Sequence, residues 1–242
     1  MNDITSGGLL GGRVTYRQLS SGHRTGFEPV LLAASVPAHA GELVLEAGTG
    51  AGAALLCLAA RVPGITGIGV EYEPALARLA AENFQANGFA QNFCIQGDAM
   101  RLPFPSHAFH HVMANPPWFD AASTASPDAR RALAHQAGPE LLGGWIASLT
   151  RVLCPKGSIT LVLPAASFAT ASAALRGAGC GAVTLFPLWP RAGEPAKIII
   201  LSARRAAKSP DRVLPGLILH DAAGITGAAQ AILREAQSTS GV

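Results

Sequence analysis

The chain has 242 residues, of which 49% are apolar and only 14% are charged, and its net charge is +3. A mean hydropathy of +0.31 would suit a membrane protein, but no apolar stretch reaches the roughly 20 residues needed to span a bilayer, and the N-terminus lacks the layout of a signal peptide. Apolar residues recur in every segment, which excludes a disordered chain. The four cysteines are scattered and form no pair, as is typical of a reducing compartment. We therefore expect a cytoplasmic protein with no membrane contact.

Short apolar runs alternate with segments of helical periodicity along the chain. Strands are expected at 43–45, 68–70, 93–95, 111–113, 158–163, 183–186 and 197–203. Helices are expected at 53–62, 74–87, 141–153 and 165–175, because Pro and Gly bound these segments where helices start and stop. This alternation predicts an open α/β sheet of seven mostly parallel strands, with helices on both faces. The connection 187–195 holds no helix, so the last strand should be antiparallel to its neighbour.

Glycine or acidic residues follow each of the first three strands, where open α/β sheets bind their ligands. The segment Glu46-Ala47-Gly48-Thr49-Gly50-Ala51-Gly52 follows the first strand; its glycines allow a tight turn and a close approach of ligand to backbone. On its own this segment also fits a dinucleotide-binding pattern. Glu71 ends the second strand and can accept hydrogen bonds from both hydroxyls of a ribose. Asp98 follows the third strand and can accept one from an adenine amino group. The alternative for a carboxylate at any one of these positions is that it caps a helix. A ligand site is favoured because all three segments follow the ends of strands in the same sheet.

A proline-rich segment after the fourth strand discriminates between cofactors. Ala114-Asn115-Pro116-Pro117-Trp118 contains two consecutive prolines, which fix the backbone and have no N–H, so the carbonyl groups there can only accept hydrogen bonds. Together with the amide oxygen of Asn115 they form a rigid pair of acceptors for a planar –NH2 group. Trp118 adds a face on which a base can stack. A nicotinamide enzyme has no use for this arrangement.

Taken together, these residues resemble the S-adenosylmethionine-dependent amino-methyltransferases of the class-I Rossmann-like fold. The sequence is similar in particular to the bacterial tRNA1(Val) adenosine-37 N6-methyltransferase family, through the segment Gly22 to Leu32 and through a tail around Pro195-Ala196-Lys197 and Leu214 to His220. Two positions depart from the family pattern, which usually has a shorter acid at Glu28 and Tyr or Phe at Trp118. We expect one domain, made of an N-terminal segment (1–40), a core (41–205) and a C-terminal extension (206–242).

The resemblance implies S-adenosylmethionine as the methyl donor and an RNA adenine as the acceptor, with an adenosine of a tRNA anticodon loop as the target. Asn115, Pro116, Pro117 and Trp118 would form the catalytic segment. The cofactor contacts that it implies are Gly26, Glu28, Glu46, Gly48, Thr49, Gly50, Gly52, Glu71, Asp98 and Ala99.

Most of the net positive charge lies in one segment. Residues 191–212 contain six basic and two acidic residues, a net charge of +4. Arginine pairs with phosphate and stacks on bases. The predicted RNA contacts are Arg191, Lys197, Arg204 and Arg205.

Two other function classes stay open from the sequence. The acceptor could be another planar amine, namely glutamine N5 of a protein or guanine N2 of ribosomal RNA, or the chain could be a non-catalytic module that binds the cofactor. His107, His110 and His111 have no carboxylate or cysteine at ligand spacing, so no metal site is expected. The sequence allows either a monomer or a homodimer.

Overall fold

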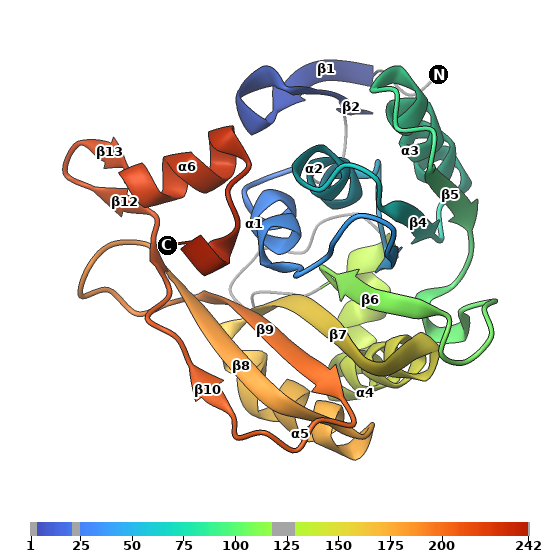
Figure 1. The fold of residues 1–242 in the computed structure, drawn as a ribbon, viewed down its shortest axis with the longest axis vertical. Helices are drawn as coiled ribbons and strands as arrows, with labels where there is room; N and C mark the ends of the chain where they lie inside the picture. The colour runs from blue at the N-terminus through green and yellow to red at the C-terminus, as the bar shows by residue number, and fades with distance from the viewer. Residues whose placement is uncertain (1–3, 21–24, 118–128, 242) are drawn as a thin grey trace.

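A nine-stranded sheet crosses the molecule (Figure 1). The computed structural model describes residues 4–20, 25–117 and 129–241. Seven strands form the main part of the sheet, in the spatial order β8 (Cys180–Trp189), β9 (Ile198–Arg205), β7 (Leu153–Pro164), β6 (Phe109–Ala114), β3 (Leu43–Ala47), β4 (Thr66–Glu71) and β5 (Asn92–Gln96). Two short strands, β10 (Arg212–Val213) and β11 (Leu217–Ile218), pair with the outer edge of β8.

The strand directions confirm the predicted topology. Strands β3, β4, β5, β6 and β7 pair in parallel, and β9 is antiparallel to both β7 and β8. The carboxyl ends of the parallel strands therefore meet at one edge of the sheet, hereafter the carboxyl edge, and their starts meet at the opposite amino edge. Because β8 runs in the direction of β7, it too ends at the carboxyl edge.

Helices cover both faces of the sheet (Figure 1). On one face lie α1 (Glu28–Ser35), α2 (Ala53–Arg61) and α3 (Pro74–Ala86), and on the other lie α4 (Ala129–Val152) and α5 (Phe168–Gly177). Alternate residues of β7 serve the two layers: Val162 packs in the cluster of α1 and α2, whereas Leu161 and Leu163 pack in the cluster of α4 and α5. Burial on both faces explains why the strands are continuous apolar runs.

One helix and one strand are longer than the sequence indicated. The predicted helix 141–153 is only the last part of α4, which begins at Ala129; Gly138-Pro139 is a typical helix boundary in sequence but here lies inside the helix. Leu153, the last residue of the predicted helix, instead begins β7, a strand of 12 residues.

Two additions outside the sheet were not predicted and bring the chain ends together. Near the N-terminus, β1 (Ile4–Leu9) and β2 (Val14–Leu19) form a hairpin around the short helix η1 (Leu10–Gly12). Near the C-terminus, the hairpin of β12 (His220–Asp221) and β13 (Gly224–Ile225) leads into α6 (Gly227–Glu235).

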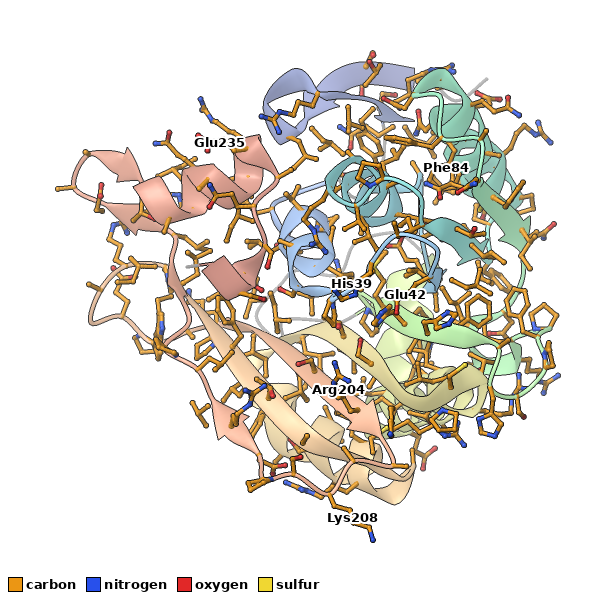
Figure 2. All side chains as sticks on the ribbon, in the orientation of Figure 1. His39, Glu42, Phe84, Arg204, Lys208 and Glu235 are labelled. Atoms are coloured by element: carbon orange, nitrogen blue, oxygen red, sulfur yellow. The ribbon has the colours of Figure 1, made fainter. Side chains whose placement is uncertain are left out.

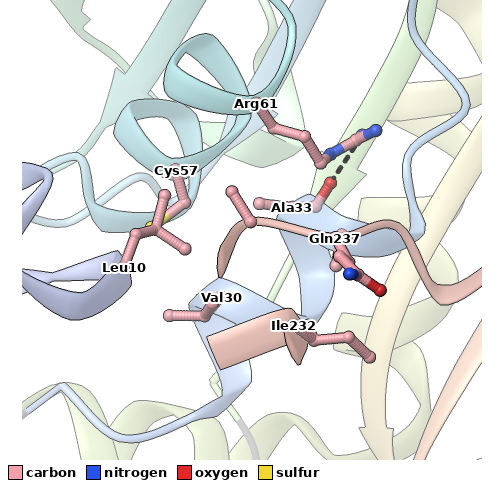
Figure 3. A pocket seen from close by; sticks show the side chains of 9 residues that line it. Leu10, Val30, Ala33, Cys57, Arg61, Ile232 and Gln237 are labelled. Atoms are coloured by element: carbon pink, nitrogen blue, oxygen red, sulfur yellow. Dashed lines mark hydrogen bonds between the residues drawn. The ribbon is translucent and has the colours of Figure 1, made fainter. Parts of the chain in front are cut away.

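Helix α6 packs on η1 and α1 and so joins the two ends of the chain (Figure 1). Figure 3 shows this junction, where Leu10, Val30, Cys57 and Ile232 face one another and Arg61 donates a hydrogen bond to the carbonyl oxygen of Ala33. The space that they enclose is too small to admit a water molecule.

Two of the cysteines are held in the protonated form by burial. The four cysteines are free thiols, and burial raises the pKa of Cys57 and of Cys94 to about 12, so both stay protonated and unreactive.

Within the described ranges, no helix combines the length and the apolar character needed to cross a membrane.

The junction of α6 with α1 should contribute measurably to stability. Ile232 is fully buried, so Ile232→Ala should lower the free energy of unfolding by about 2 to 5 kcal/mol, through lost burial and the cavity left behind. Val213→Ala serves as the control, because Val213 is 73% exposed and should cost about 0.5 kcal/mol or less. Urea denaturation measures both; equal losses would show that α6 does not pack as described.

Candidate functional site at the carboxyl edge of the sheet

The turn between β3 and α2 lies at the carboxyl edge and is tied to the neighbouring strand. The backbone N–H groups of Gly48 and Thr49 both donate to the carbonyl oxygen of Val70, at 2.8 and 3.1 Å. Gly52 then donates to the carbonyl of Thr49 at 2.8 Å and begins α2. These bonds place the start of α2 beside the end of β4.

The three glycines of this turn all have positive φ, but they differ in what surrounds them. A Cβ on Gly48 would lie 2.7 Å from the ring of Trp145, and one on Gly52 would lie 2.9 Å from the ring of Phe84. A Cβ on Gly50 would meet no atom within 4 Å. Gly48 and Gly52 are therefore required by packing within the protein, whereas Gly50 leaves backbone open to a ligand.

Glu46 holds the turn from inside the protein. One oxygen of its buried carboxylate accepts hydrogen bonds from the Thr49 hydroxyl at 2.6 Å and from the Leu55 backbone N–H at 3.1 Å. Burial raises the pKa of Glu46 to about 8, so the group is mostly neutral at pH 7. Both Glu46 and the Thr49 side chain are thus used within the turn, and the sequence did not reveal that they bond to each other.

Glu71 joins the turn to the segment that follows β4. One of its oxygens accepts from the backbone N–H of Gly50 at 2.9 Å, and the other accepts from the N–H of Glu73 at 2.9 Å. The residue is 4% exposed. The carboxylate therefore lies directly beside the open backbone of Gly50, as the predicted ribose contact requires.

Two further residues lie at the ends of β4 and β5. Asp98 caps the short helix η2 (Ala99–Arg101) by accepting from the backbone N–H of Met100 at 2.8 Å. Ala99 is buried. Asp98 therefore acts as a helix cap, and its contact with adenine stays a prediction. Tyr72, which was not among the predicted site residues, is 71% exposed next to Glu71; an aromatic residue directly after a strand-ending acid was the available signal.

Strand β6 delivers the proline segment to the same edge. Its last residue, Ala114, pairs in register with Ala47 of β3 and with Leu161 of β7. Asn115 is half-buried, Pro116 is buried and Pro117 is exposed. Asn115 thus follows β6 directly beside Gly48, which follows β3. Trp118 lies outside the described residues.

The start of α1 completes the edge. Gly26 precedes α1, and a Cβ there would collide with the carboxylate of Glu28, the first residue of the helix. A short loop leads from the end of α1 to the start of β3 at the amino edge, so the start of α1 lies toward the carboxyl edge. The structure thus brings the predicted cofactor residues to one edge of the sheet.

The four predicted RNA contacts are not brought together. Arg191 and Lys197 flank the loop between β8 and β9 at the carboxyl edge. Arg204 and Arg205 end β9 toward the amino edge, where Arg204 is in register with Ser158 of β7. An extended strand rises about 3.4 Å per residue, so β9 separates the two pairs by about 25 Å.

Arg205 has a bonding role of its own at the amino edge. Its guanidinium donates to the carbonyl oxygens of Thr150 and Leu153, at the end of α4. A cation at a helix C-terminus satisfies carbonyls that have no partner within the helix. The basic segment is therefore not one patch, and Arg205 is used in a structural cap.

A buried histidine organises the amino edge. The His111 ring bonds to the Glu42 carboxylate at 2.9 Å and to the Ser158 hydroxyl at 2.7 Å, which links three neighbouring strands. Desolvation lowers the pKa of His111. Figure 2 shows Glu42 beside His39, with Arg204 nearby. The described residues include no group of three or more side chains that could hold a metal ion.

The chain is similar to known methyltransferases in sequence. Residues 44–138 match the model of a methyltransferase domain. A curated tRNA1(Val) (adenine(37)-N6)-methyltransferase of Aeromonas hydrophila is 30% identical over 158 residues, and the match covers 63% of this chain and 66% of that protein. A protein of the same name from Yersinia pestis is 29% identical over 64% of this chain and 66% of its own length.

Solved structures share the fold. A predicted O-methyltransferase from Agrobacterium tumefaciens superposes with a TM-score of 0.71 at 22% identity, over 84% of this chain and 94% of that one. A geranyl diphosphate C-methyltransferase from Streptomyces coelicolor, solved with S-adenosyl-L-homocysteine, superposes with a TM-score of 0.54 at 12% identity, over 74% of this chain and 75% of that one. At these identities the likeness concerns the fold alone.

The raised pKa of Glu46 should appear in the pH dependence of stability. Its ordinary pKa is 4.5 and its folded value is about 8, so between these values the unfolded chain has lost a proton that the folded protein retains. The free energy of unfolding should therefore fall as the pH rises from about 4.5 to about 8, by up to about 1.4 kcal/mol per pH unit from this group.

Glu46→Gln should remove this component, so that the difference in stability between wild type and variant changes steadily across that window. Glu140→Gln, at an exposed position, is the control and should leave the slope unchanged. Denaturant titrations at several pH values measure the slopes. Parallel curves for wild type and Glu46→Gln would contradict the buried neutral carboxyl.

Proposed function

We propose that the chain, whose residues 44–138 match the model of a methyltransferase domain, transfers a methyl group from S-adenosylmethionine to the exocyclic N6 amine of an adenine in RNA, with a tRNA anticodon-loop adenosine as the target. One observation carries the proposal: Asn115-Pro116-Pro117 follows β6 directly beside the glycine turn that follows β3. In this position Asn115 and Pro116 would serve as a pair of acceptors for a planar amine, next to a backbone that is open to a ligand. The similarity to the tRNA-modifying relatives supports RNA adenine as the acceptor.

The residues at the carboxyl edge fit the cofactor. S-adenosylmethionine, when bound, supplies an electrophilic methyl group on a sulfonium. The open backbone at Gly50 gives such a ligand access to the turn, and the Glu71 carboxylate, 2.9 Å from the Gly50 nitrogen, provides acceptors for ribose hydroxyls. A carboxylate has about four acceptor positions, so it can accept from ribose hydroxyls as well as from backbone N–H groups. Tyr72 adds an exposed ring next to Glu71, on which adenine can stack.

Other predicted cofactor residues form the surroundings of this contact. Asp98 and Ala99 would contact the adenine edge, and Gly26 and Glu28 would approach the methionine end from α1. Glu46 acts at one remove, because its bonds to Thr49 and Leu55 position the turn.

Asn115 and Pro116 would act on the target amine. The adenine nitrogen is a poor nucleophile because its lone pair is delocalised into the ring. Hydrogen bonds from its two hydrogens to the Asn115 side-chain oxygen and the Pro116 carbonyl draw the nitrogen toward a tetrahedral shape and direct its lone pair at the methyl group. As the N–C bond forms, the bond from the methyl carbon to the sulfonium breaks, S-adenosylhomocysteine is the leaving group, and the cationic nitrogen loses its extra proton to water. Catalysis then consists of positioning and charge stabilisation and requires no strong base. Trp118 would stack on the target base, which must leave its own stack to enter the site.

Nucleoside mass spectrometry of tRNA and ribosomal RNA, from cells with and without the gene, tests the activity. We expect N6-methyladenosine to be lost from tRNA without the gene and restored by the wild-type copy. Asn115→Ala should not restore it, yet the purified variant should still bind S-adenosylmethionine in calorimetry. Loss of N2-methylguanosine, or no change in RNA, would indicate another planar amine, and restoration by Asn115→Ala would remove the acceptor role.

Arg191 and Lys197 are the cations that we assign to RNA phosphates, because both lie at the carboxyl edge. Their joint neutralisation to Gln should weaken binding of a tRNA anticodon stem-loop and reduce the slope of log affinity against log salt by about one to two, since each lost phosphate contact releases fewer counterions.

Arg204→Gln with Lys208→Gln is the matched pair at the amino edge and should leave this slope unchanged. Figure 2 shows Lys208 projecting from the body of the protein beyond β9. Fluorescence anisotropy at several salt concentrations measures both pairs. Equal slopes for the two pairs would mean that the carboxyl edge does not receive the RNA backbone.

A further inference from the structure

An open pocket of about 770 Å³ lies beside the end of β8, apart from the glycine turn and the Asn115 segment, and Arg191 lines it. Arg191 and Ala192 of the loop between β8 and β9 form one wall, and Ile218, His220 and Thr226 of the C-terminal extension form the other. Figure 1 shows this loop next to the hairpin of β12 and β13. We call it the C-terminal groove. Its volume is in the range of pockets that hold small ligands.

The wall of the groove formed by the C-terminal extension is fixed by bonds to the end of β8. The backbone N–H groups of Leu219 and His220 donate to the carbonyls of Trp189 and Pro190, at 2.8 and 3.0 Å. The Trp189 indole N–H donates to the carbonyl of Pro215 at 2.9 Å. Gly216 has a φ of +82°, and a Cβ there would collide with the carbonyl oxygen of Pro187. The extension is therefore held against the end of β8, and His220 is held at the carboxyl edge.

Two rings meet at this position. The centroid of the His220 ring lies 6.4 Å from that of Phe27, with 42° between the planes. Phe27 is 41% exposed and immediately precedes Glu28 at the start of α1. Any of the four nucleobases can stack on an exposed aromatic side chain, because each has a π-face. The pair thus connects the groove to the edge that carries the proposed cofactor contacts.

The polar groups of the groove match the remaining parts of a nucleotide. Among the described residues, Arg191 forms an ion pair with Glu194 at 3.6 Å, and both side chains are about half exposed or more. Such a pair is weak, so the guanidinium can exchange it for a phosphate at little cost. Asp221 lines the same groove and accepts from the Ala223 N–H with one oxygen. A carboxylate there favours a base bearing an amino group and disfavours a second phosphate.

The groove and the Asn115 segment are too far apart to hold the same base. Three strand spacings separate β6 from β8, through β7 and β9, and at about 4.8 Å each they amount to about 14 Å. Both positions lie on the same edge of the sheet, so one RNA strand crossing that edge can occupy both.

We propose that the C-terminal groove binds a nucleotide of the substrate RNA that flanks the methylated adenosine, with its base on the Phe27–His220 pair and its phosphate on Arg191. This assignment rests on the proposed RNA methyltransferase activity. It gives the C-terminal extension a role in selecting the RNA, apart from the transfer reaction.

Photocrosslinking tests the assignment directly. An anticodon stem-loop RNA with 4-thiouridine placed at one flanking position at a time is bound to the full-length protein and irradiated. We expect at least one flanking position to crosslink to Phe27 or to the segment 216–222, as read by mass spectrometry of the crosslinked peptide. Crosslinks from every flanking position that map only to other segments would overturn the assignment.

Kinetics supply the second readout. His220→Ala and Phe27→Ala should each raise the KM for the stem-loop RNA roughly fivefold or more, with kcat within about twofold of wild type and cofactor affinity unchanged. Two variants are used because His220 is half-buried, whereas Phe27 is exposed. Phe93→Ala is the control, since Phe93 is 53% exposed on β5 at the far side of the sheet.

A KM within twofold of the control for both variants would overturn the groove assignment while the methylation itself stands. A wild-type protein that methylates no RNA would instead overturn the proposed function. The two failures are thereby distinguished.

Discussion

The candidate site depends on the turn between β3 and α2, which the buried carboxyl groups of Glu46 and Glu71 hold. Glu46 bonds to Thr49 and Leu55 from inside the turn, and Glu71 bonds to the backbone of Gly50 from the next strand. With Gly48 packed under Trp145 and Gly52 under Phe84, only Gly50 has open space around it. The turn is therefore rigid where it meets the protein and accessible at one residue, as a preorganised binding site requires.

The residues proposed to bind ligands and the residues that only stabilise the fold lie at opposite edges of the sheet. The carboxyl edge gathers the glycine turn, Glu71 and the Asn115 segment, each at the end of its own strand. At the amino edge His111 links Glu42 and Ser158, and Arg205 caps the end of α4. Because β9 is antiparallel to β7, it begins at the carboxyl edge and ends at the amino edge. Lys197, directly before β9, therefore lies at the carboxyl edge, and Arg204, near its end, lies at the amino edge.

The C-terminal extension is more than an appendage to the sheet. Helix α6 packs on α1 and η1, so that Ile232 and Leu10 share one apolar cluster. The segment before it runs along β8 and places His220 against Phe27. The two chain ends thus meet where α6 packs on η1 and α1, whereas the groove that we assign to a flanking nucleotide is lined by the loop between β8 and β9 and by the C-terminal extension.

The sequence by itself determined the sheet, its seven main strands, the antiparallel last strand and the segments that follow each strand. These features are local, since apolar periodicity and Gly and Pro positions act over a few residues. It did not reveal which glycine is open, because that depends on Trp145 and Phe84, which are distant in the chain. It also did not reveal that Thr49 and Glu46 bond to each other, or that His220 meets Phe27. Charge along the chain suggested one basic patch at 191–212, but a strand of β9's length places its ends at opposite edges. Only the tertiary structure decided these points, because each depends on contacts between residues far apart in sequence.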